Sequence, residues 1–125
     1  MLANKDAAAN LAVRDIDRAR KFYEGTLGLE QVGSEGDELI VYRSGKTILN
    51  VYRSDYAGTN KATAVTWAVG DDVEGVVRAL KAKGVTFEHY DMPDMRLEGD
   101  VHLAGKMKVA WFKDPDGNIL NIVNG

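Results

Sequence analysis

Asparagine side chains interrupt two of the most apolar stretches of the chain. TILNVYR (residues 47–53) contains Asn50, and NILNIV (118–123) contains Asn121. An amide buried in a strand needs hydrogen-bond partners, since leaving it without them costs roughly a few kcal/mol. Such amides recognise a ligand or water, or hold one another in a structural clasp. The sequence leaves both interpretations open for Asn50 and Asn121.

Acid–base and metal chemistry would depend on few side chains. The chain has two histidines and no cysteine, which excludes disulfides, thiolate metal sites and a cysteine nucleophile. His102 lies in the connection 94–106, beside Glu98 and Asp100. A metal site of His102 with these carboxylates is conceivable, but residues two apart on a flexible loop argue little for it. The pattern favours a polar loop residue, with a catalytic or ligand role as the alternative.

Other chemical motifs have structural explanations. DPDG (114–117) resembles part of a calcium loop, but the distal Glu is missing; Pro second and Gly fourth indicate a type I turn. The serines stand outside any G-x-S-x-G context, so nucleophilic catalysis is not supported. Neither a phosphate-binding loop nor a dinucleotide fingerprint is present.

The bulk composition is that of one globular domain. The 125 residues are 45% hydrophobic and 28% charged, enough for one core but not two independent ones. The net charge of −3 leaves no basic surplus for a nucleic-acid partner. The N-terminus lacks the apolar region of a signal peptide, and no apolar run reaches membrane-spanning length. We therefore expect a soluble, cytoplasmic protein without membrane or nucleic-acid partners.

The elements that would position these residues occur twice. Helix-spaced apolar residues run from Ile16 to Leu27 and from Val73 to Leu80, each after aspartate and before glycine. Each helix follows a strand-like stretch (8–13 and 64–69) and precedes three more: 29–32, 38–43 and 47–53, then 85–90, 107–112 and 118–123. The chain is thus βαβββ twice, an internal duplication within one domain, 1–125. Its first module covers about 7–53, the linker 54–61 and the second module about 62–124.

Strand alternation separates two faces of the predicted sheet. Leu49, Val51, Leu120 and Ile122 would face the helices, as would Trp67. Small and polar residues collect on the other face, which predicts a cavity there. The predicted ligand-binding residues on or at the rim of this face are Asn10, Asn50, Tyr52, Thr66, Tyr90, Trp111 and Asn121.

Two segments resemble a known family. VRDIDRARKFYEGTLGL (13–29) and WFKDPDGNILNIV (111–123) are similar to the vicinal-oxygen-chelate superfamily, which includes glyoxalase I, bleomycin-resistance proteins and extradiol dioxygenases. YAGTNKATAVTW (56–67) and FEHYDMP (87–93) resemble a bacterial glyoxalase-like branch. The resemblance implies an α+β fold in which two βαβββ modules form a cupped mixed sheet with helices outside. It also implies a homodimer.

The resemblance places four metal ligands at Ala8, Asn50, Ala64 and Asn121. Alanine coordinates nothing, and two neutral amides cannot hold a catalytic divalent ion of the zinc, iron or nickel type. A one-residue alignment slip, to Asn10, Thr66 or Val65, does not restore a ligand set. We therefore predict no metal and no other cofactor.

Three functions remain to be compared. The first is metal-independent binding of a small molecule in the cup, as in bleomycin-resistance proteins. The alternative is a metal-dependent or acid–base lyase, isomerase or dioxygenase, with candidate residues His102, Glu88, Glu98 and Asp91. The third is an interaction module whose cup has lost its ligand. Whether the chain is an enzyme is left open by the sequence.

Overall fold

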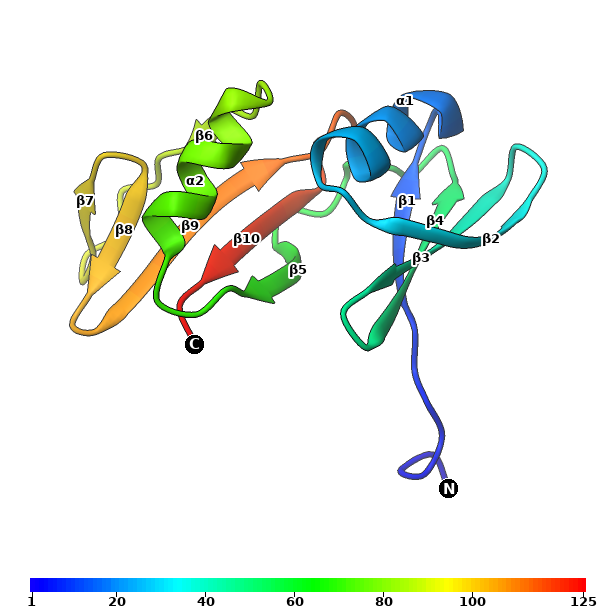
Figure 1. Cartoon of the computed structure of the whole chain (residues 1–125), viewed down its shortest axis with the longest axis horizontal. Helices are drawn as coiled ribbons and strands as arrows, with labels where there is room; N and C mark the ends of the chain where they lie inside the picture. Colours follow the sequence, from blue (N-terminus) through cyan, green and yellow to red (C-terminus); the bar gives the residue numbers. More distant parts are fainter. The chain divides into compact units, whose positions relative to one another are not determined.

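The computed structural model describes all residues from Met1 to Gly125. The chain forms two compact units, Met1–Gly58 and Thr59–Gly125, shown from blue to green and from green to red in Figure 1. Each unit contains a mixed sheet and one helical segment; the order is βαβββ in unit 1, and unit 2 has the same order with two further short strands after its helix. The α+β class and the duplicated module predicted from the sequence are thereby confirmed.

Unit 1 contains a four-stranded sheet. Its elements are β1 (Ala9–Val13), α1 (Ile16–Arg20), β2 (Glu30–Glu35), β3 (Leu39–Ser44) and β4 (Thr47–Arg53). The strand order is β1-β4-β3-β2, and β1 runs parallel to β4. Asp15 begins the helix because its carboxylate accepts the Arg18 backbone N–H at 3.1 Å. The helix continues as a π-helical segment, η1 (Lys21–Thr26).

The helix-facing side of this sheet forms the core of unit 1. Leu49 and Val51 are buried there, as the strand alternation predicts. The rings of Tyr23 and Tyr42 lie 6.0 Å apart within the same core. The Tyr42 hydroxyl donates to Glu24 Oε2 at 2.7 Å. Burial, followed by this hydrogen bond to the carboxylate, raises the pKa of Tyr42.

Unit 2 contains a larger sheet covered by α2 (Val73–Ala82). Its strands are β5 (Thr63–Ala68), β6 (Phe87–Glu88), β7 (Arg96–Glu98), β8 (Val101–Ala104), β9 (Met107–Lys113) and β10 (Ile119–Val123). The order is β5-β10-β9-β8-β7, with β6 also paired to β9. Asp72 caps α2 by accepting the Gly75 N–H at 3.0 Å. Neither helix of the chain has the length and apolar character needed to cross a membrane.

The core of unit 2 lies between α2 and the sheet. Phe112, Leu120 and Ile122 are buried with Val73 and Val77 of α2. The Phe112 ring lies 5.6 Å from that of Phe87 and 6.5 Å from that of Trp67. Trp67 is therefore part of the helix-facing packing, as the sequence predicts.

The hairpin β7–β8 corrects one sequence prediction. The segment 94–106 was predicted to be a loop and His102 a polar loop residue, but His102 lies in β8 with 1% of its surface exposed. Strands of three and four residues are too short to show a clear alternation. Pairing with β9, where His102 lies opposite Val109, sets the hairpin against the sheet.

The turn between β9 and β10 confirms the structural interpretation of DPDG. The Gly117 N–H donates to the Asp114 carbonyl at 3.0 Å, which closes the turn. The Asp114 carboxylate is 4% exposed and accepts the backbone N–H groups of Asp116 and Asn118, both at 2.9 Å. It also accepts Asn118 Nδ2 at 2.8 Å. This turn fixes the register in which Trp111 lies opposite Asn121.

Candidate functional site

The face of the second sheet opposite α2 collects the candidate side chains. Asn121 pairs with Trp111 of β9 on one side and with Thr66 of β5 on the other. Directly paired residues point to the same face of a sheet, so these three share a face. His102 belongs to the same face, because its partner Val109 lies two residues from Trp111. We refer to this side as the open face of unit 2.

Trp111 is the centre of an aromatic cluster on the open face. The His102 ring lies 4.9 Å from Trp111 and the Tyr90 ring 5.4 Å, both in edge-to-face geometry. Tyr90 and His102 lie 6.1 Å apart. The Tyr90 backbone N–H donates to His102 Nε2 at 2.9 Å, which brings the segment after β6 against His102. Trp111 Nε1–H donates to Thr63 Oγ1 at 3.0 Å.

Three buried polar atoms of this region have no hydrogen-bond partner. They are the Tyr90 hydroxyl, His102 Nδ1 and Asn121 Oδ1. All three belong to residues that contact Trp111 or lie directly opposite it in the sheet. Burying an unsatisfied polar group costs about 1–3 kcal/mol, so three at one place are unusual in a folded protein. Such a concentration is typical of a site that a ligand completes.

A pocket of about 240 Å³ lies beside this cluster. Tyr90 and Trp111 line it together with Met92, Ile119 and Lys61. A pocket of this size suits a monocyclic or small bicyclic molecule rather than a drug-sized one. We call it the Trp111 pocket.

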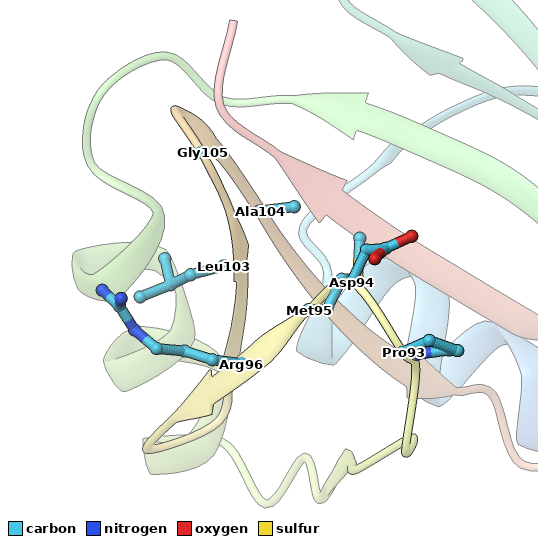
Figure 2. A pocket seen from close by; sticks show the side chains of 7 residues that line it. All are labelled: Pro93, Asp94, Met95, Arg96, Leu103, Ala104 and Gly105. Atoms are coloured by element: carbon cyan, nitrogen blue, oxygen red, sulfur yellow. The ribbon is translucent and has the colours of Figure 1, made fainter.

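A second pocket, of about 390 Å³, lies at the β7–β8 hairpin. Figure 2 shows that its lining comes from residues 93–96 and 103–105, with the Arg96 guanidinium and the Asp94 carboxylate pointing apart. No aromatic residue lines it, and Asp94 and Arg96 are both exposed to solvent. It therefore lacks the buried polar groups and rings that distinguish the Trp111 pocket.

In unit 1 the candidates also share a face. Asn10 pairs directly with Asn50, and Tyr52 with Ala12, so all of them lie opposite the face that α1 covers. Asn50 is half-buried, whereas Tyr52 is 39% exposed. The structure thus groups Asn10, Asn50 and Tyr52 in unit 1, and Thr66, Tyr90, Trp111 and Asn121 in unit 2.

The four positions where the family resemblance places metal ligands carry no side chains that fit a metal ion. Ala8 and Ala64 offer methyl groups, and Asn50 and Asn121 offer neutral amides. No three His, Asp or Glu side chains come together in a geometry that could hold an ion.

The alternative metal site around His102 is wrong. Glu98 pairs with Val101 rather than His102, so its side chain lies on the opposite face, where its nearest cation is Arg96 at 3.8 Å. The Asp100 carboxylate bonds instead to Lys81 Nζ and His89 Nε2, each at 2.7 Å. The proximity of these residues in sequence does not translate into proximity of their functional groups, because the hairpin directs them to different partners.

Asp100 gives the hairpin a pH-dependent attachment to α2. Hydrogen bonding to Lys81, and secondly to His89, lowers the pKa of Asp100 in the folded protein. The stabilisation is therefore present above the unfolded-state pKa of about 4 and disappears as the pH falls through the folded-state pKa. We expect Asp100→Asn to have a lower urea midpoint than wild type at pH 6 and a smaller loss of midpoint between pH 5 and pH 2.5.

Asp94→Asn is the matched control, since Asp94 is an exposed carboxylate on the neighbouring segment. It should retain the wild-type loss of midpoint across the acid range. If Asp100→Asn and Asp94→Asn gave the same pH dependence, the lowered pKa of Asp100 would not contribute to folding.

Comparison with known proteins identifies the family. The model of the Glyoxalase/Bleomycin resistance protein/Dioxygenase superfamily matches residues 7–122. The chain belongs to this superfamily. The resemblance noted in the sequence is confirmed, and the match extends over both units.

Solved structures with the same fold align with almost the whole chain. Lactoylglutathione lyase from Agrobacterium tumefaciens is 18% identical over 98% of this chain and 94% of its own, with a TM-score of 0.71. An integron cassette protein from the Halifax Harbour sewage outfall metagenome is 15% identical over 98% and 99%, with a TM-score of 0.72. A variant of the fosfomycin resistance protein FosX from Listeria monocytogenes, complexed with Mn(II) and 1S,2S-dihydroxypropylphosphonic acid, is 16% identical over 100% and 92%, with a TM-score of 0.73. At these identities the likeness establishes the fold.

The sequence did not predict two residues that contact Trp111 in the structure. His102 was recognised as chemically capable but was placed in a loop, and Thr63 was not considered. The only local signal for His102 is the strand-like stretch VHLA, in which successive side chains point to opposite faces. This stretch has four residues, which is too short to predict a strand. The partner of Thr63 is 48 residues away in sequence, so no local pattern predicts that contact.

Proposed function

We propose that this superfamily member binds a small aromatic molecule in the Trp111 pocket without a metal ion. The observation that carries the proposal is the position of this pocket beside three buried polar atoms that lack partners. The pocket offers rings and a thioether to an apolar ring, and the polar atoms offer hydrogen bonds to a substituent. By resemblance and composition we also expect a homodimer and a cytoplasmic location.

The proposal of metal-independent binding rests on the donor set. Catalytic ions of this superfamily's type need imidazole or carboxylate ligands, whereas the corresponding positions here carry Ala8, Asn50, Ala64 and Asn121. The two histidines have other contacts: His89 bonds to Asp100, and His102 accepts the Tyr90 N–H. We expect no stoichiometric retention of Mn, Ni, Zn or Fe after dialysis, measured by elemental analysis of the untagged protein. One retained equivalent of any of them would contradict this part of the proposal.

An acid–base lyase or isomerase of the same superfamily is the second candidate. One observation favours it: His102 Nδ1 has no partner and lies on the open face beside Trp111. Glu88 lies opposite Trp111 on the open face, but its carboxylate pairs with Lys113 at 3.2 Å, and Glu98 lies on the other face. A lone imidazole without an acidic or basic partner gives less support to proton transfer than to ligand binding.

Indole is a suitable first probe, because it is a neutral aromatic molecule that needs no particular substituent to enter an apolar pocket. With EDTA present, we expect indole to shift the backbone amide resonances of residues around the Trp111 pocket in a titration followed by two-dimensional ¹H–¹⁵N NMR. Trp111→Leu should weaken binding at least tenfold, since it removes the largest ring of the pocket.

Trp67→Phe is the matched control, because Trp67 packs against Phe112 on the helix side of the same sheet. It should leave indole affinity within twofold of wild type. Binding that requires added metal, or that survives Trp111→Leu unchanged, would refute the proposed function.

A further inference from the structure

The hydrogen bond between Tyr90 and His102 determines which imidazole nitrogen carries the proton. A backbone N–H can only donate, so His102 Nε2 must accept the Tyr90 N–H at 2.9 Å. Nε2 also lies 3.2 Å from the Tyr90 carbonyl oxygen, but a proton on Nε2 would oppose the amide hydrogen at the shorter distance. The neutral ring therefore carries its proton on Nδ1, the nitrogen without a partner.

The three unpartnered atoms then present a defined hydrogen-bonding pattern. His102 Nδ1–H is a donor, the Tyr90 hydroxyl is a second potential donor, and Asn121 Oδ1 is an acceptor. A carboxamide or lactam complements this pattern, because its carbonyl oxygen accepts two hydrogen bonds and its N–H donates one. A ketone would leave Asn121 Oδ1 without a donor.

An anionic group is a poorer match for these atoms. All three belong to uncharged groups buried from solvent, and burying a carboxylate among them would cost its hydration without an ion pair in return. Lys61 also lines the Trp111 pocket, but it is exposed to solvent and is not among the residues that carry the buried atoms. The buried part of the site therefore selects a neutral group.

Trp111 belongs both to the lining of the pocket and to the aromatic cluster. Its indole lines the pocket and makes edge-to-face contacts with the Tyr90 and His102 rings. The indole is half-buried, and its N–H donates to Thr63, whose side chain is exposed at the start of β5. A rotation of Trp111 would cost this exposed hydrogen bond and two ring contacts.

Building on the proposed function, we propose that Tyr90, His102 and Asn121 form a subsite for the carboxamide or lactam group of an aromatic ligand, reached when Trp111 moves aside. The ring of the ligand lies in the Trp111 pocket, and its neutral polar group replaces the missing partners of the buried atoms. The site thus selects aromatic amides over acids and ketones of the same shape.

Benzamide, benzoate and acetophenone test this selection, since they share one ring and nearly one shape. With EDTA present at pH 7.5, we expect benzamide to bind at least tenfold more tightly than either of the others. Nitrogen-15 NMR of the imidazoles should show His102 protonated on Nδ1 in the free protein, and its Nδ1 resonance should shift on adding benzamide. His89→Gln assigns the signals, because the chain has two histidines.

Tyr90→Phe removes one atom that has no partner within the protein, so the variant should fold as well as wild type. We expect it to lose at least fivefold in benzamide affinity, because it removes one of the two donors to the carbonyl oxygen. Acetophenone, whose carbonyl oxygen would accept from the same hydroxyl, should lose affinity by a similar factor. Tyr42→Phe is the matched control: its hydroxyl bonds to Glu24 in unit 1, and benzamide affinity should not change.

The outcomes separate this inference from the proposed function. If all three probes bind equally and in a Trp111-dependent manner, the subsite is refuted and the proposed function stands. The same conclusion follows if His102 is protonated on Nε2. If neither indole nor any of the three probes binds, both proposals fail.

Discussion

Asp114→Ala is expected to lower the free energy of unfolding of unit 2 by about 3 kcal/mol. The buried carboxylate accepts two backbone N–H groups and the Asn118 amide, each at 2.8–2.9 Å. Hydrogen bonds to a charged group contribute about 1.5–3 kcal/mol each, and alanine removes the acceptor of both hydrogen bonds that the buried Asn118 donates to Asp114. The expected loss is smaller than the sum of these three hydrogen-bond contributions, because the Asp116 N–H can donate to water once the carboxylate is removed.

Tryptophan fluorescence measures this change directly, because Trp67 and Trp111 both belong to unit 2. Urea titrations should show a lower midpoint for Asp114→Ala with an unchanged slope. Asp37→Ala is the control, since Asp37 is an exposed carboxylate in the turn between β2 and β3. Its expected effect is below about 0.5 kcal/mol. A similarly small effect of Asp114→Ala would mean that the turn closes without its carboxylate.

The duplicated βαβββ order was predictable because local rules decide each element. Alternating apolar residues determine which face of β4 and β10 is buried, and Leu49, Val51, Leu120 and Ile122 are buried as expected. Asp15 and Asp72 cap the helices at the residues where the sequence predicts it. Such signals extend over a few residues and need no knowledge of the remaining fold.

The position of His102 was not predictable by the same rules. Its placement depends on pairing with β9 and on the N–H of Tyr90, twelve residues earlier in the chain. The short strands β7 and β8 carry glycine and charged residues at their turn, which local reasoning interprets as a loop. A side chain's chemistry can be identified from sequence, but its burial and its partners here are set by non-local strand pairing.

On the open face, too, some features could be predicted from local sequence and others could not. Strand alternation in the sequence predicts that Asn121 and Thr66 lie on this face. In the structure Asn121 pairs with Trp111 on one side and with Thr66 on the other, as that prediction requires. Sequence alone could not show that Asn121 Oδ1 and the Tyr90 hydroxyl are buried without partners, because this depends on how every neighbouring atom packs. The ligand recognition and structural clasp interpretations of Asn121 therefore need an experiment that distinguishes a satisfied amide from an unsatisfied one.

Two asparagines in the same motif, Asn118 and Asn121, provide that experiment, because substitution by leucine should change stability in opposite directions. Both are 7% exposed. Asn118 donates its side chain to Asp114 at 2.8 Å, whereas Asn121 Oδ1 has no partner. We expect Asn118→Leu to lower the free energy of unfolding by about 2 kcal/mol, since it breaks a charge-assisted hydrogen bond. Asn121→Leu should raise it by about 1 kcal/mol, since it removes a buried unsatisfied acceptor.

Comparing the two variants isolates the role of the amide, because the change in side-chain shape is the same at both positions. Urea titrations followed by tryptophan fluorescence give both values, and benzamide titrations of Asn121→Leu add the binding measurement. A more stable protein with weaker benzamide binding is the result expected if Asn121 is kept for a ligand at the expense of folding stability. A loss of stability as large as that of Asn118→Leu would instead show that Asn121 is satisfied in the folded protein, as the clasp interpretation requires.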